Sequence, residues 1–273
     1  MRGTPLGGST VLITGGGSGI GRRMAIGAAR RGANVVVWDL SAERGSAVRD
    51  EIRAHRLPCE SHVVDITDKA AVRAAAEATG PVDVLVNNAG VVAGKPLLET
   101  SDAAIERTMA VNVLALYWVT RAFLPAMVRR RRGTVATVAS AAGLVGVARQ
   151  TDYAASKWAA VGFTESLRAE MRIGRTGVRT LVACPYYVDT GMFEGVRSRV
   201  PLLLPILREG DVARRILDAV ESGREQLVMP PVVRLVPVLR ALPVRAFDAV
   251  NDLLGINRTM DHFTGRPGDA PGA

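Results

Sequence analysis

A glycine run near the start of the chain, residues 14–21 (TGGGSGIG), constrains the fold more than any other stretch. It follows the short apolar run 11–13 and opens a segment with a helical pattern, 19–31. A strand, a glycine turn and a helix in this order let the backbone approach a pyrophosphate, whose charge then faces the first helical turn. A plain flexible loop is the alternative, because a lone glycine pattern is weak evidence.

A second apolar run, 35–38, supports the binding interpretation. It ends in Asp39, 18 residues past Gly21. An acidic side chain at this distance can accept hydrogen bonds from the ribose hydroxyls of a dinucleotide. We therefore prefer the dinucleotide site to the flexible loop. The residues expected to contact the ligand here are Gly15, Ser18, Gly19, Ile20, Gly21 and Asp39.

Apolar runs alternate with helical patterns along the rest of the chain. Strands are predicted at 10–13, 35–38, 61–64, 83–86, 133–138, 178–183 and 225–228. Helices are predicted at 19–31, 41–56, 68–78, 102–130, 152–173 and 211–222. Continuous apolar strands that alternate with helices predict an α/β fold with a doubly wound parallel sheet, the Rossmann fold. We expect one domain at 1–228 and an apolar, basic C-terminal extension at 229–273 packed on it.

The composition excludes several function classes. The net charge is +9, but the arginines are scattered and no nucleic-acid motif is present, so we expect no nucleic-acid partner. The histidines lack metal-ligand spacing, and the two cysteines do not form a Cys-x-x-Cys pair, so we expect no metal. There is no apolar leader, and the longest uncharged run, 133–148, is too short to span a bilayer. A cytoplasmic location is the expectation.

A tyrosine and a lysine four residues apart, Tyr153 and Lys157, carry the predicted chemistry. On a helix they project from one face, and the ammonium is expected to lower the pKa of the phenol. Such a phenol is a general acid/base for a carbonyl/alcohol pair, although a surface Tyr/Lys pair is the alternative. Ser140 follows an apolar strand and can donate to a substrate oxygen or cap its own backbone. Asn112 satisfies a neighbouring backbone, holds a proton-relay water, or does both.

These motifs together resemble the short-chain dehydrogenase/reductase family over nearly the whole chain. The resemblance implies that Tyr153 is the catalytic acid/base, Lys157 also binds the nicotinamide ribose, Ser140 positions the substrate oxygen and Asn112 completes a proton relay. It also implies further cofactor contacts at Asp65, Ile66, Asn88, Ala89, Gly90, Pro185, Val188 and Thr190. One departure is Tyr186, which stands where the family usually has glycine after Pro185.

The segment around Tyr186 and the run 36–40 look like the branch that holds retinol dehydrogenases and membrane-associated hydroxysteroid dehydrogenases. The resemblance implies an NAD(H)-dependent oxidoreductase that acts on a lipophilic alcohol. NADP is less favoured because Asp39 would repel a 2′-phosphate, although Arg22, Arg23 and Arg44 are nearby counter-charges. The alternatives are an NADPH-dependent ketoacyl or small-carbonyl reductase and a non-catalytic nucleotide-sensing protein.

The apolar stretches 200–207 and 227–247 are expected near the mouth of the site. Arginines at 234, 240 and 245 among leucines and valines are typical of an interfacial segment. The two stretches either form a lid for a lipophilic substrate that touches a membrane surface, or pack on the domain or another subunit. We expect a homo-oligomer and, at most, peripheral membrane contact.

Overall fold

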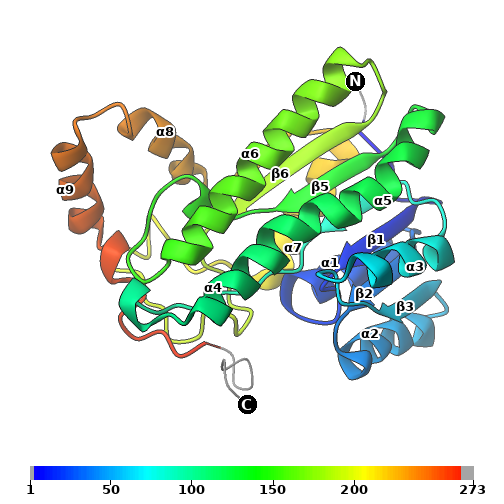
Figure 1. Ribbon diagram of the computed structural model, residues 1–273, viewed down its shortest axis with the longest axis horizontal. Helices are drawn as coiled ribbons and strands as arrows, with labels where there is room; N and C mark the ends of the chain where they lie inside the picture. The colour runs from blue at the N-terminus through cyan, green and yellow to red at the C-terminus, as the bar shows by residue number, and fades with distance from the viewer. Residues whose placement is uncertain (1–2, 266–273) are drawn as a thin grey trace.

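A parallel sheet forms the centre of the protein, as the computed structural model in Figure 1 shows. The structure describes residues 3–265, so the outermost ends of the predicted domain and extension, 1–2 and 266–273, lie outside the described residues. The seven strands are β1 (Thr10–Thr14), β2 (Asn34–Asp39), β3 (Cys59–Val63), β4 (Val84–Asn87), β5 (Thr134–Val138), β6 (Arg179–Pro185) and β7 (Gln226–Met229). Their order is β3-β2-β1-β4-β5-β6-β7, and every pairing is parallel. The predicted doubly wound fold is confirmed.

Helices cover both faces of the sheet (Figure 1). The helices of the described residues are α1 (Gly19–Arg30), α2 (Ala42–Ala54), α3 (Lys69–Thr79), α4 (Asp102–Met109), α5 (Ala115–Arg130), α6 (Thr151–Ile173), α7 (Glu209–Ser222), α8 (Val236–Leu239) and α9 (Val244–Leu254), the last two of which do not lie on the sheet. The strand order reverses between β1 and β4. Ligands of open α/β sheets bind beyond the carboxyl ends of the strands at such a point.

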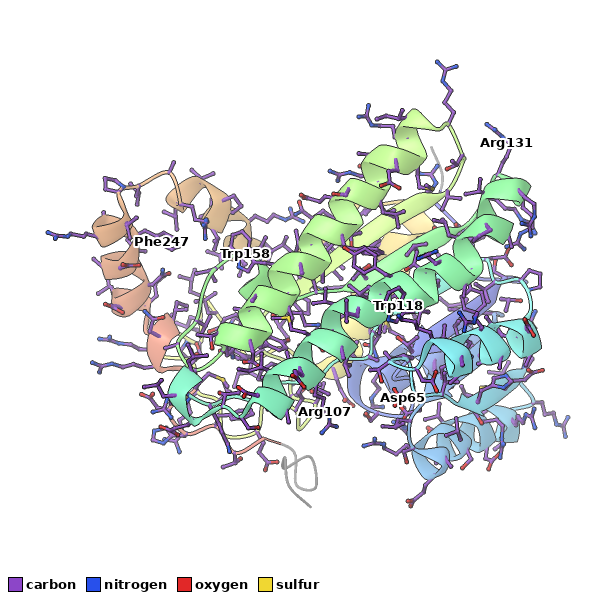
Figure 2. The ribbon with its side chains drawn as sticks, in the orientation of Figure 1. Asp65, Arg107, Trp118, Arg131, Trp158 and Phe247 are labelled. Atoms are coloured by element: carbon purple, nitrogen blue, oxygen red, sulfur yellow. The ribbon has the colours of Figure 1, made fainter. Side chains whose placement is uncertain are left out.

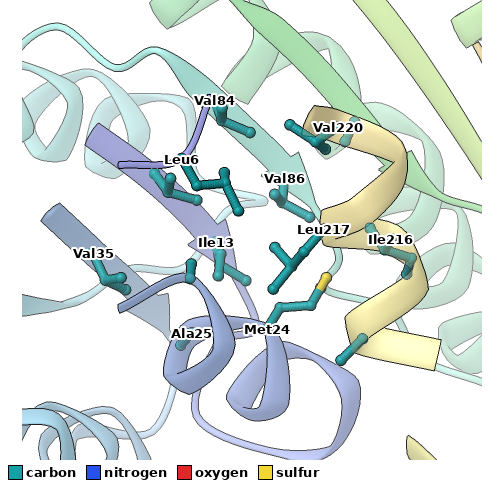
Figure 3. Packing of buried hydrophobic residues seen from close by; sticks show 14 of the residues in the cluster. Leu6, Ile13, Met24, Ala25, Val35, Val84, Val86, Ile216, Leu217 and Val220 are labelled. Carbon is teal, nitrogen blue, oxygen red and sulfur yellow. The ribbon is translucent and has the colours of Figure 1, made fainter. Parts of the chain in front are cut away.

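The continuous apolar strands are explained by two cores, one on each face of the sheet. Val11 and Ile13 of β1 face the core beneath α1 and α7, and Leu12 between them faces the core beneath α5 and α6. Figure 3 shows Met24 of α1 and Leu217 of α7 meeting over Ile13 on the first face. Because side chains alternate along a strand, a strand buried on both sides has no polar side to show.

Several element boundaries differ from the predictions by one to three residues. Strand β3 begins at Cys59 rather than 61, and α7 begins at Glu209 rather than 211, with Arg208 as its N-cap residue. The helical pattern 102–130 is interrupted by a π-helical turn, Ala110–Leu114, whereas Pro125 stays inside α5. Propensity and pattern predict the existence of elements better than their ends, which depend on tertiary contacts.

One helical stretch in the described part of the chain, Asp102–Arg130, is long and apolar enough to cross a membrane, with a mean hydropathy of 1.4. Core helices of globular proteins pass the same test. Here Val119, Phe123 and Met127 of α5 are buried against the sheet.

The chain beyond β7 forms short helical pieces. They are the 3-10 turn Pro231–Leu235, α8, α9 and a second 3-10 turn, Ile256–Arg258. In Figure 1, α8 and α9 (orange to brown) stand to one side of the sheet, beyond α6. Val233, Ile256 and Met260 are buried, so this segment packs on the rest of the protein at separate anchor points.

Candidate active site

A cavity of about 1050 Å³ lies at the carboxyl ends of the central strands. Its walls come from the glycine turn after β1, the segments that follow β2, β4, β5 and β6, and the chain beyond β7. All of the predicted site residues line this cavity except Asn112. Residues far apart in the sequence, from Gly15 to Thr190, are therefore brought to one site as the switch-point argument predicts.

The glycine turn has no room for side chains. A Cβ at Gly21 would overlap the carbonyl oxygen of Gly15, and a Cβ at Gly17 would lie 2.7 Å from Asp39 Oδ2. Gly15 also has a φ of +61°, a backbone conformation that side-chain-bearing residues rarely adopt. This bare turn leads directly into α1, whose first turn carries no acidic residue. The arrangement fits a pyrophosphate at a helix N-terminus.

Thr14 is a supporting residue that motif matching did not assign to the site. Its hydroxyl oxygen accepts from the backbone N–H groups of Asn88 (3.0 Å) and Ala89 (3.2 Å). The Asn88 side chain returns hydrogen bonds to the carbonyls of Thr14 (2.9 Å) and Gly15 (3.1 Å). This reciprocal set joins the glycine turn to the end of β4. The signal was present, because the threonine begins the glycine run itself.

Asp39 ends β2 and is buried at the edge of the cavity. Its Oδ2 accepts from Gly17 N–H and its Oδ1 from Ser41 N–H, both at 2.9 Å. Arg44 Nε lies 3.7 Å from Oδ1, and Arg44 also lines the cavity. The other two nearby arginines, Arg22 and Arg23, form ion pairs with glutamates and do not line the cavity. The carboxylate is thus fixed at the edge of the cavity, with one cation beside it.

Asp65 follows β3 and is exposed. Its Oδ1 accepts from Thr67 N–H (2.9 Å) and from the Thr67 hydroxyl (2.7 Å), a turn that shapes this edge of the cavity. On the opposite side, the segment after β6 reaches back over the glycine turn. A Cβ at Gly19 would lie 3.1 Å from Thr190 Cβ. The cofactor residues predicted from the family resemblance therefore surround one elongated space.

Tyr153 and Lys157 project from the first turns of α6 and are both buried. Lys157 Nζ donates to the carbonyl of Val138 at the end of β5 (3.1 Å) and lies 5.5 Å from the centre of the Tyr153 ring. Ser140 Oγ accepts from Ala142 N–H (3.1 Å), so the predicted backbone-capping role is present. A side-chain hydrogen bond also joins Ser140 to Tyr153.

The expected direction of the Tyr153 pKa shift is wrong for the protein by itself. Burial raises the pKa of Tyr153 above its usual value of 10, and the Ser140 hydrogen bond opposes this only in part. Burial also lowers the pKa of Lys157 to about 8. Attraction between phenolate and ammonium favours the charged form of both groups, but burial penalises the charged form of each and is the larger effect.

Asn112 lies in the π-helical turn between α4 and α5. Its Oδ1 accepts from Val91 N–H and its Nδ2 donates to Val91 O, both at 2.9 Å, and Nδ2 also donates to Ser156 Oγ (3.0 Å). The backbone role is therefore present, and it fixes the loop after β4. A Cβ at Gly90 would lie 3.3 Å from Asn112 Oδ1 and 3.5 Å from Lys157 Nζ, so both groups border that glycine. The proton-relay role stays a prediction.

The far part of the cavity is apolar and comes mostly from segments without sequence motifs. Phe193 stacks edge-on against Tyr153, with ring centres 5.6 Å apart. Beyond it the walls include Leu204, Leu239, Phe247 and Leu254. Figure 2 shows Phe247 on α9, well away from Asp65 at the other end of the site. The apolar stretches 200–207 and 227–247 were expected near the mouth, and both contribute wall residues.

Comparison with known proteins identifies the family. The model for short chain dehydrogenases matches residues 9–201. The chain therefore belongs to the short-chain dehydrogenase/reductase family, and it is an oxidoreductase of the alcohol dehydrogenase and carbonyl reductase type.

Curated relatives support the predicted likeness to the retinol dehydrogenase branch. Epidermal retinol dehydrogenase 2 of Mus musculus is 37% identical over 95% of this chain and 86% of its own length. Retinol dehydrogenase 10 of Homo sapiens is 37% identical over 94% of this chain and 85% of its own length.

Solved structures agree on the fold but differ in cofactor. A short-chain dehydrogenase/reductase from Burkholderia phymatum in complex with NAD has a TM-score of 0.80, with 26% identity and 99% of each chain covered. A metagenomic short-chain oxidoreductase in complex with NADP has a TM-score of 0.68, with 32% identity over 82% of this chain and 96% of its own. The family thus includes users of both cofactors.

Proposed function

We propose that this enzyme transfers hydride between NAD and a lipophilic alcohol or its carbonyl form, with a retinoid, steroid or fatty alcohol as the substrate type. The observation that carries the proposal is the apolar arm of the cavity, which runs from Phe193 beside Tyr153 to Phe247 on α9. An apolar arm of this kind recognises a long hydrocarbon chain or ring system by burial. The names of the curated relatives support the same class of substrate.

The side chains around Tyr153 have separate roles in this proposal. With its pKa raised by burial, Tyr153 holds its proton at neutral pH and can donate it to a carbonyl oxygen. In the opposite direction Tyr153 must first be a phenolate, whose charge Lys157 and the Ser140 hydrogen bond stabilise, and on accepting the alcohol proton it becomes the neutral phenol. Ser140 orients the substrate oxygen. NAD, when bound, supplies the hydride acceptor, and the protein supplies position and electrostatics.

Asp39 supports NAD over NADP. The buried Asp39 side chain accepts from two backbone N–H groups beside the proposed ribose position and repels a 2′-phosphate. Arg44 is the cation that works against this preference. In this proposal the remaining cofactor contacts are made by the predicted residues of the glycine turn and by Thr190, all of which line the cavity.

In this proposal the chain beyond β7 is a lid over the cavity, and the same segment contacts a membrane surface. Leu235, Val238, Val244 and Leu253 are exposed apolar side chains of this segment, and Arg245 lies among them. Exposed leucines and valines beside arginine are suited to the interface of an anionic bilayer. We propose a cytoplasmic enzyme that takes its substrate from such a surface. A homo-oligomer is also part of the proposal, with exposed Leu114 at the end of the π-helical turn before α5 as a contact candidate.

Turnover assays with purified protein test the proposal. Retinol, a steroid alcohol, a long-chain fatty alcohol and a short alcohol are each offered with NAD and with NADP. Higher kcat/KM for the long apolar alcohols with NAD is expected. Higher kcat/KM with NADPH and small carbonyl compounds instead points to the alternative reductase, and cofactor binding without any turnover points to a nucleotide sensor.

A further inference from the structure

Three buried polar side chains from distant parts of the chain form a hydrogen-bonded series at the cavity wall. Gln150 precedes α6, Tyr187 follows β6, and Thr259 follows the last 3-10 turn; their exposed fractions are 1%, 8% and 2%. Gln150 Nε2 donates to Tyr187 Oη (3.1 Å), which lies 2.8 Å from Thr259 Oγ1. Because the Thr259 hydroxyl donates to the carbonyl of Ile256 (2.8 Å), it accepts from Tyr187. Each hydroxyl thus donates once and accepts once.

One end of the series lies at the start of the catalytic helix. Gln150 is the N-cap residue of α6, and its carbonyl accepts from Ala154 N–H (2.7 Å), the residue after Tyr153. A second route joins the same residues through rings. Tyr187 stacks edge-on against Phe193 (5.1 Å between ring centres), which stacks edge-on against Tyr153 (5.6 Å). Two sets of contacts therefore link Tyr187 to Tyr153: the hydrogen bonds through Gln150 and the ring contacts through Phe193.

The other end of the series lies in the segment 256–265, which we call the strap. The strap is held to the loop after β6: Arg197 N–H donates to Thr259 O (3.2 Å), and Thr264 N–H donates to Glu194 O (2.9 Å). Between these anchors, the Phe263 ring packs on Gly94 in the loop after β4, so closely that a Cβ at Gly94 would overlap it. The strap thus reaches from the β6 side of the cavity to the β4 side.

We propose that Tyr187 is a positioning residue that couples the strap to Tyr153. When the strap lies across the cavity, Thr259 accepts from Tyr187, and Tyr187 in turn accepts from Gln150 at the start of α6. If the strap lifts, the buried hydroxyl of Tyr187 loses its acceptor, which is unfavourable in an apolar surrounding. A long substrate that touches strap residues Ile256 and Phe263 thereby favours the arrangement that holds Tyr153 in place. This inference rests on the proposed role of Tyr153.

The first test compares two tyrosine-to-phenylalanine variants by amide hydrogen exchange. Tyr187→Phe keeps the ring but removes the shared hydroxyl. Tyr117→Phe is the matched control, because Tyr117 lies on α5, is 44% exposed and does not line the cavity. In Tyr187→Phe we expect exchange to rise roughly tenfold both in the strap and in the first turn of α6, the scale of one lost buried hydrogen bond. The control variant is expected to match the unaltered protein.

The second test asks whether a change confined to the strap reaches the catalytic helix. Thr259→Val removes the hydroxyl and nearly keeps the shape, whereas Thr259→Ser keeps the hydroxyl. Thr259→Val should speed exchange in the first turn of α6, raise KM for a long alcohol and lower kcat for the same alcohol. Thr259→Ser should restore all three. If Thr259→Val opens the strap but leaves the α6 exchange rate and kcat unchanged, the strap is only a local anchor and the coupling is wrong.

The two proposals fail in different ways. Hydrogen exchange needs no substrate, so it tests the coupling between the strap and α6 even if no alcohol is turned over. Absence of turnover in the unaltered protein contradicts the proposed function alone. The Thr259 variants also provide an answer if Tyr187→Phe does not fold.

Discussion

The buried ammonium of Lys157 should cost the protein stability, and the substitution Lys157→Met should reveal this cost. Burial lowers the pKa of Lys157 from 10.5 to about 8. A lysine whose pKa is lowered on folding destabilises the native state at every pH below the lowered value. That cost disappears as the pH rises from 8 to 10.5, because the unfolded chain then also loses its proton. At pH 7 a shift of this size corresponds to roughly 3 kcal/mol.

Methionine fills a similar volume without a charge, but it cannot donate to the carbonyl of Val138, which Lys157 contacts at 3.1 Å. An unpaired buried carbonyl costs about 1–2 kcal/mol. The net expectation is that Lys157→Met raises the free energy of unfolding at pH 7 by roughly 1–2 kcal/mol. As the pH approaches 10.5 only the lost hydrogen bond remains, so the variant should then become the less stable protein. Turnover should fall by at least about a hundredfold at either pH, since the proton-transfer site is disrupted.

Urea unfolding at pH 7, 8, 9 and 10, at one fixed protein concentration, measures this difference. Burial raises the pKa of Tyr153, so this side chain keeps its proton between pH 7 and 10 in both folded proteins and its contribution cancels in the comparison. A variant that is less stable than the unaltered protein at pH 7 would refute the reasoning. So would a stability difference that does not change between pH 7 and 10.

The remaining predictions concern the proton, the cofactor, the lid and the membrane. Tyr153→Phe should lower kcat by at least about a hundredfold while NAD affinity, measured by calorimetry, stays nearly unchanged. Asp39→Ser should raise kcat/KM for NADP relative to NAD by about tenfold, because the repelling carboxylate is gone. Arg240 lies 4.6 Å from the centre of the Trp158 ring; Arg240→Gln should raise KM for long alcohols about threefold, the scale of one exposed cation–π contact, with short alcohols unaffected. Leu253→Asp should reduce co-sedimentation with anionic liposomes, and unchanged co-sedimentation would contradict the membrane proposal.

Local patterns were enough to predict the dinucleotide half of the molecule. The strand, the glycine turn and α1 adjoin in the sequence, and their function depends on backbone conformation that glycine alone allows. The single acid after β2 could be placed because parallel strands end at one edge of a sheet. For the same reason Ser140, which follows β5, could be assigned to that edge, whereas Lys157 was assigned from its four-residue spacing to Tyr153 on one helix.

The tertiary structure alone decided the rest, since it depends on contacts between residues far apart in the chain. Asn112 forms hydrogen bonds with Val91 and Ser156, and neither partner can be predicted from sequence spacing. The direction of the Tyr153 pKa shift follows from how completely α6 is covered, which a pairing rule does not include. The series from Gln150 through Tyr187 to Thr259 joins three segments that no motif contains. Sequence patterns predict contacts between residues that are close in the chain. Burial and long-range hydrogen bonds arise only once distant segments are packed together.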